Sequence, residues 1–112
     1  MTADEFRALA LALPETEEDQ HMGHPDFRVR KKIFATLASD DTWGMVKLTP
    51  AQQKSFRFAD PKAFEPIAGA WGKRGYTKVI LADADELTVR QALAAAWRNT
   101  APKKLAERFT DE

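Results

Sequence analysis

Apolar and polar residues alternate along two neighbouring stretches of the chain, residues 26–29 and 33–37. Alternation with a period of two places side chains on one face of a β-sheet, so each stretch is predicted to be a strand. The segment between them is short and basic, which predicts a β-hairpin with Arg30, Lys31 and Lys32 at its tip. Two further strands are predicted, over residues 43–48 and 76–81.

Sequence patterns typical of α-helices occur before, between and after these predicted strands. Thr2 and Glu5 have the spacing of a capping box, and apolar residues follow at helical intervals until Pro14, which ends the helix. Further helices are predicted over residues 49–58, from a cap at Asp83 or Asp85 to about residue 99, and in a short segment that starts at Pro102. Residues 15–23 are a polar segment, and residues 59–75 are expected to be irregular because they contain two prolines and three glycines.

This order of elements predicts an α+β fold. Strands joined by tight turns form an antiparallel sheet, and helices at both ends of the chain suit one face of it, which gives a two-layer sandwich. Residues 1–112 are expected to form a single domain. The predicted core residues are Phe27, Val29, Ile33, Leu37, Val46, Val79, Leu81, Leu93 and Trp97.

Composition narrows the chemistry that the chain can perform. Hydrophobic residues make up 44% of it, enough for a real core, and cysteine is absent, which excludes disulfides, thiol nucleophiles and thiolate metal sites. The N-terminus is acidic where a signal peptide would be basic, and no run approaches the length of a membrane span. We therefore expect a cytoplasmic monomer with no membrane association.

The chain has no net charge, but its charged residues are unevenly distributed along the sequence. The 17 basic and 17 acidic residues cancel, which argues against strong general binding of nucleic acid. Residues 1–19, however, contain six acidic side chains and one basic one, whereas residues 28–32 and 73–78 contain basic side chains and no acidic ones. Any interaction with a polyanion is therefore expected at these two basic segments.

Two groups of residues are candidate nucleic-acid contacts. The first consists of Arg28, Arg30, Lys31 and Lys32, which would meet phosphates if the hairpin tip reaches a duplex, or would be a solvated tip that protects the sheet edge. The second consists of Trp71, Lys73, Arg74 and Lys78, together with Tyr76. Aromatic rings between cations can stack on bases. Trp71 could equally cover the edge of the core.

The sequence gives little support to a metal site, a catalytic nucleophile or a phosphate-binding loop. His21 and His24 are three apart with Asp19 and Asp26 nearby, but a metal site needs three or four converging ligands, so no metal is expected. The sequence contains no Gly-x-Ser-x-Gly motif and no phosphate-binding glycine loop followed by a helix. We therefore expect neither a cofactor nor an enzymatic activity.

Several segments together resemble the MmcQ/YjbR-like family. They are residues 13–18 (LPETEE), 23–29 (GHPDFRV), 32–37 (KIFATL), 69–79 (GAWGKRGYTKV), 93–98 (LAAAWR) and 101–102 (AP). The resemblance implies a frataxin-like (CyaY-like) α+β sandwich and a double-wing mode of DNA binding, in which two hairpins act as wings. The family often has glycine in the first hairpin turn. Here the turn is Arg30–Lys31–Lys32, so a longer loop or a different geometry is expected, because two-residue primed turns need positive φ.

These observations predict a non-enzymatic binding module that contacts double-stranded DNA weakly through its two basic groups. The alternative is a protein- or metal-interaction module that uses the acidic first helix and Glu15, Glu17, Glu18 and Asp19. A continuous basic surface from residues 28–32 to residues 73–78 would favour nucleic acid.

Overall fold

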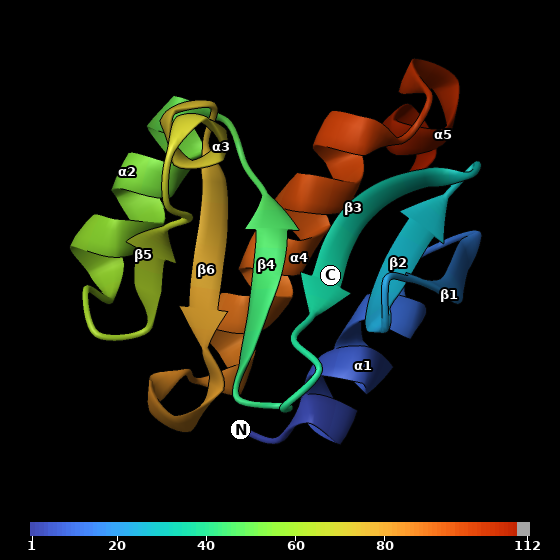
Figure 1. Cartoon of the computed structure of the whole chain (residues 1–112). Coiled ribbons are helices and arrows are strands. Elements are labelled where there is room, and N and C mark those ends of the chain that lie inside the picture. The colour runs from blue at the N-terminus through green and yellow to red at the C-terminus, as the bar shows by residue number, and fades with distance from the viewer. Residues whose placement is uncertain (110–112) are drawn as a thin grey trace.

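A computed structural model describes residues 1–109 of the chain (Figure 1). Its centre is a six-stranded sheet in which every neighbouring pair of strands is antiparallel, in the order β1-β2-β3-β4-β6-β5. The strands are β1 (Thr16–His21), β2 (His24–Val29), β3 (Lys32–Leu37), β4 (Trp43–Lys47), β5 (Phe64–Pro66) and β6 (Tyr76–Ile80). The predicted antiparallel sheet is confirmed.

Helices cover one face of this sheet and leave the other open (Figure 1). The helices of the described chain are α1 (Ala3–Leu11), α2 (Pro50–Ala59), α3 (Ala70–Lys73), α4 (Glu86–Thr100) and α5 (Lys103–Arg108), with a short 3-10 turn at Leu81–Asp83; α3 lies at the β5–β6 edge, and its Trp71 reaches the open face. Thr2 and Thr49 each form the predicted capping box with the residue three positions on. The predicted α+β sandwich is therefore confirmed, and no helix within residues 1–109 is long and apolar enough to cross a membrane.

The core lies between the helices and the covered face of the sheet. Each residue predicted for it is buried except Ile33, which was placed on the wrong face. Arg28 pairs with Ile33 but Phe27 pairs with Ala35, so Phe34 is an extra residue in β3. This β-bulge shifts the alternation by one position, which buries Phe34 and turns Ile33 to the open face.

The turn between β2 and β3 is tighter than expected. Val29 pairs directly with Lys32, so only Arg30 and Lys31 form the turn, and both have positive φ, 49° and 69°. This is the backbone of a two-residue primed turn, built here without glycine. The expectation of a longer or different turn is therefore wrong. Each residue bears the left-handed conformation at a cost of about 1–2 kcal/mol.

Two strands were missed by the sequence analysis. β1 falls in the predicted polar segment, and β5 falls in the segment expected to be irregular, which also contains α3. Both strands lie at the edges of the sheet. β1 carries polar side chains that are almost all exposed, as is common for edge strands, so it shows no apolar alternation. β5 has only three residues, too few for a periodic signal.

Charged residues separate toward two ends of the molecule. Both β4 and α4 run from one end to the other (Figure 1). At the end where α4 begins, the backbone of Leu81 bonds to Thr42 and to the amino group of Met1, which brings three acidic segments together. Their acidic residues are Asp4, Glu5, Asp40, Asp41, Asp83, Asp85 and Glu86. At the opposite end, the amide of Asn99 in α4 bonds to the carbonyl of Lys47 in β4.

Candidate functional site

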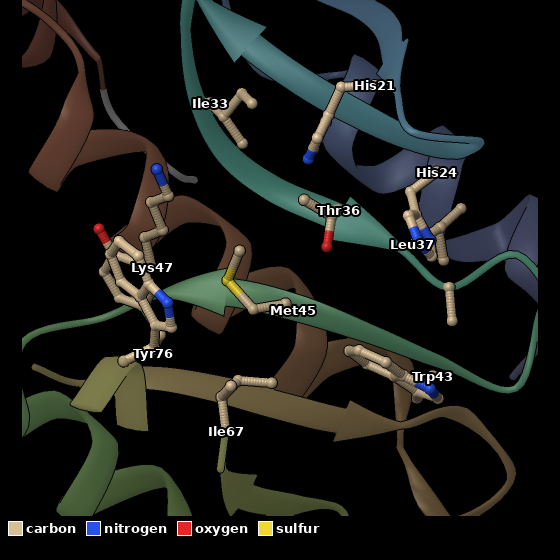
Figure 2. A pocket seen from close by; sticks show the side chains of 12 residues that line it. His21, His24, Ile33, Thr36, Leu37, Trp43, Met45, Lys47, Ile67 and Tyr76 are labelled. Carbon is tan, nitrogen blue, oxygen red and sulfur yellow. The ribbon is translucent and has the colours of Figure 1, made fainter. Parts of the chain in front are cut away.

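The open face of the sheet is hollowed into a groove of about 350 Å³ (Figure 2). Its lining comes from all four central strands, from β1, and from Ile67 and Trp71 in the connection between β5 and β6, so no single segment of the sequence contains it. Met45 lies in the middle, with Trp43 toward one end and Tyr76 toward the other. The groove is mostly apolar and is bounded along its sides by residues such as Ile33 and Ile67.

Strand alternation explains how these side chains reach the groove. In β4, Gly44 and Val46 face the core, whereas Trp43, Met45 and Lys47 face the open side. Glycine is required at residue 44, because a Cβ atom there would lie 2.8 Å from the ring of Phe6 in α1. The covered face is therefore packed tightly against α1, and the bulky residues of β4 are on the open side.

Each aromatic ring of this surface has a cation over it. Lys78 Nζ lies 4.9 Å from the ring centre of Trp43, and Lys47 Nζ lies 5.2 Å from that of Tyr76. Trp71 stacks on Tyr76, with ring centres 5.2 Å apart and planes inclined by 14°. The guanidinium of Arg74 covers Trp71 at 5.0 Å. Flat apolar surface and positive charge therefore occur side by side along the groove.

A buried carboxylate organises the corner of the groove next to β1. Asp26 is fully buried and accepts hydrogen bonds from Nδ1 of His21 at 2.7 Å and from Nε of Arg28 at 2.8 Å. A second bond from Arg28 makes that contact bidentate. Burial alone raises the pKa of the Asp26 carboxyl, but the bonds from Arg28 and His21 outweigh it, so its pKa lies below the ordinary value. The carboxylate fixes the position of the His21 ring.

The first predicted basic group consists of two arginines that form ion pairs and two lysines that differ from them in this respect. Arg28 is bound to Asp26, and Arg30 forms a bidentate ion pair with Glu15, with Nε 2.5 Å from Oε1. Within the described part of the chain, no carboxylate forms an ion pair with Lys31 or Lys32. With respect to the described carboxylates, Lys31 and Lys32 are therefore the members of the group whose charge is not neutralised.

A second groove joins these lysines to the first one. It has a volume of about 510 Å³ and is lined by Lys31, Lys32, Ile33, Lys47 and Tyr76, among others. Ile33, Lys47 and Tyr76 also line the first groove. A continuous surface therefore runs from the turn to Tyr76. Lys47 was not among the predicted site residues, although its position in the outward alternation of β4 could have indicated it.

The second predicted group is assembled differently from a hairpin tip. Trp71 and Lys73 lie on α3, Arg74 caps that helix, and Lys78 is in the middle of β6. Lys78 also lies 3.7 Å from Glu65 in the neighbouring strand. The two predicted wings are thus a true hairpin turn and a helical connection between β5 and β6.

Further cations surround the β2–β3 turn. A third groove is lined by Arg30 and by residues of the C-terminal segment, namely Pro102, Lys103, Lys104, Leu105 and Arg108. We call the cations of this groove and the second one, apart from Arg28, the basic end: Arg30, Lys31, Lys32, Lys47, Lys103, Lys104 and Arg108. Among residues 1–109, the acidic residues on the segments that carry these cations are Glu15, which is paired with Arg30, and Glu107 in α5. The sequence analysis missed the lysines of α5, because they are far from residues 28–32 in the chain.

The N-terminal acidic side chains are largely held by arginines. Arg7 bonds to Asp4 at 2.6 Å and to Glu18 at 2.9 Å, and Asp19 lies 3.7 Å from Arg28. The bond from Arg30 lowers the pKa of Glu15. Among residues 1–109, no three histidine or carboxylate side chains converge as a metal site would require.

Comparison with known proteins identifies relatives of this fold. A family model described as YjbR matches residues 11–99. The chain is similar to the crystal structure of Deinococcus radiodurans protein DR2400, which contains a DUF419 domain, with a TM-score of 0.73. The two are 18% identical, and the match covers 98% of this chain and 83% of that one, so the likeness concerns the fold. No curated protein matches the sequence.

Proposed function

This chain belongs to the YjbR family, and we propose that it is a non-enzymatic module that binds nucleic acid through phosphate groups. Duplex DNA is the ligand that the sequence predicted, and the basic end is the surface that would contact it. The observation that supports the proposal most is the continuity of this surface: Lys31 and Lys32 share a groove with Lys47 and Tyr76. A phosphate backbone needs such a row of unneutralised cations.

The conformation of the β2–β3 turn adds support. Arg30 and Lys31 occupy the left-handed region, where asparagine and glycine would cost less. Backbone strain of this kind persists where the side chains serve a purpose that the cheaper residues cannot. The two residues that bear the strain here both carry a positive charge at the tip of a hairpin.

The zero net charge does not oppose this proposal once the charges are placed in the fold. The cations of the basic end lie together around the β2–β3 turn and α5, away from the acidic residues at the start of α4, so we expect a polyanion that approaches the basic end to meet positive local potential. Local potential, rather than net charge, determines the rate and orientation of an electrostatic encounter.

Fluorescence anisotropy with a labelled DNA duplex at several salt concentrations tests the proposal. The decisive variant carries Lys31→Gln and Lys32→Gln, which leaves the ion pair of Arg30 intact. We expect weaker binding to every duplex sequence alike. The salt slope should fall in magnitude by roughly one for each phosphate that the variant no longer touches.

A matched control removes the same charge elsewhere, with Lys54→Gln and Lys62→Gln. Lys54 and Lys62 are exposed and lie outside the basic end. This control should bind like the parent protein. The proposal is wrong if the parent does not bind at low salt, or if the two double variants have the same affinity and slope.

The alternative function, a protein- or metal-interaction module on the N-terminal acidic face, gains no specific support. Glu15, Glu18 and Asp19 are each bound or approached by an arginine. A cation or a basic partner would first have to displace these arginines. We therefore propose the basic end rather than the acidic face as the binding surface.

A further inference from the structure

We propose that the groove on the open sheet face receives an unpaired base, so that the protein prefers single-stranded nucleic acid to duplex. The inference rests on the proposed nucleic-acid function and adds which form of the ligand is selected. In this arrangement the base lies against Met45 between Trp43 and Tyr76, and its flanking phosphates lie against Lys32 and Lys47.

The shape and lining of the groove suit a flat aromatic group. Trp43 and Tyr76 stand on either side of Met45, and Ile33 and Ile67 bound the space between them (Figure 2). Its volume of about 350 Å³ is at the small end for organic ligands. A base inserted there would contact aromatic rings and a thioether, and both form favourable contacts with π-systems.

Charge complementarity identifies the kind of aromatic ligand. A cation lies over each of the rings of Trp43, Trp71 and Tyr76, and Lys47 connects the apolar groove to the one that contains Lys31 and Lys32. A nucleotide requires this combination, because its base is flat and apolar on both faces while its phosphate is anionic. A sheet face with aromatic residues and neighbouring cations is a general solution for binding single strands.

The corner at His21 supplies a polar contact for the edge of the base. Because the Asp26 carboxylate only accepts hydrogen bonds, Nδ1 of His21 carries the proton between them. In the neutral ring, Nε2 is then an acceptor, and the ring extends toward the groove (Figure 2). Bases carry N–H donors on the edge that pairs in a duplex, and an unpaired base can present that whole edge to Nε2, whereas a paired base exposes only the amino hydrogens that face the grooves.

The test compares a labelled single strand of twelve nucleotides with the duplex of the same sequence. Trp43→Ala removes one end of the groove, and Thr36→Leu fills it from the side while keeping Trp43. We expect either variant to weaken single-strand binding roughly 5- to 100-fold, the loss typical of one stacked base. The salt slope should not change, because the lysines remain. Phe58→Ala is the matched control, since Phe58 is a 91% exposed aromatic residue outside the groove.

Tryptophan fluorescence gives an independent readout. Trp97 is fully buried, so quenching by the single strand reports on Trp43 and Trp71. Equal affinity for single strand and duplex, or unchanged single-strand binding by both groove variants, overturns the inference while the proposed function stands. Binding of 8-anilinonaphthalene-1-sulfonate in the groove without any binding of either nucleic acid overturns both, and marks a site for small aromatic anions instead.

Discussion

Nδ1 of His21 lies 2.7 Å from Oδ2 of Asp26, a carboxylate that is completely buried beneath the open face of the sheet. The two residues belong to adjacent strands, and Arg28 holds the carboxylate from its other side. Through this cluster, the stability of the sheet depends on the protonation state of the Asp26 carboxyl. It also orients the only imidazole that a described carboxylate holds at the groove.

Asp26→Asn should destabilise the protein at neutral pH. The folded pKa of Asp26 is lowered, so its stabilisation is complete well above the ordinary aspartate value near 4 and is lost as pH falls through the folded pKa. We expect a loss of roughly 1.5–3 kcal/mol at pH 7 that shrinks toward pH 3. Urea unfolding at both pH values measures it. Asp19→Asn, which removes a 62% exposed carboxylate, should change little at either pH.

Leu93→Ala should cost roughly 2–5 kcal/mol of unfolding free energy, because Leu93 is fully buried where α4 packs on the sheet. Leu87→Ala, on the same helix at a 59% exposed position, should cost less than about 0.5 kcal/mol. Chemical denaturation of both variants checks the assignment of the helix face. Similar losses for the two would show that the buried side of α4 has been misplaced.

Gly75→Ala should be among the most harmful single substitutions. Gly75 has φ of 107°, and a Cβ atom there would lie 2.2 Å from the carbonyl oxygen of Leu48. We expect a loss of at least about 2 kcal/mol from strain and collision together. Gly23→Ala isolates the strain, because Gly23 also has positive φ but faces open space, and should cost about 1 kcal/mol. Thermal unfolding of the two variants separates the two effects.

Lys31→Gly should stabilise the fold and weaken binding at the same time. Glycine relieves the left-handed backbone at φ 69°, worth roughly 1 kcal/mol, but removes one cation from the basic end. Asp41→Gly is the matched control, since Asp41 has φ of 63° in the β3–β4 turn at the acidic end. It should gain stability without losing affinity for DNA. Thermal unfolding and anisotropy on both variants test this trade-off; a Lys31→Gly protein that binds as tightly as its parent would contradict it.

Sequence reasoning succeeded where one local rule decides the structure. Thr2, Thr49 and Asp85 cap helices as their positions indicated, and the alternation in β6 buries Thr77 and Val79 while Tyr76 and Lys78 face outward. Each of these features depends on residues within a few positions of one another. Such short-range preferences are visible without knowledge of the tertiary structure.

It failed where pairing between strands overrides the local pattern. The bulge at Phe34 depends on the register of β3 against β2, so Ile33 was assigned to the wrong face. β1 is a strand because β2 offers it hydrogen bonds, although its own side chains are polar. The groove has the same origin, since Met45 and Tyr76 line one surface only because β4 and β6 are neighbours in the sheet despite the intervening segment.

The separation of acidic and basic residues along β4 and α4 gives the described part of the chain, residues 1–109, a permanent dipole moment. A uniform field exerts no net force on a neutral dipole, but it does exert a torque. Near a polyanion, the molecule would therefore rotate until its β2–β3 turn and α5 face the ligand, before any side chain makes contact. Because such alignment decays over a Debye length of about 8 Å at physiological salt, it would act on the final approach and select productive collisions.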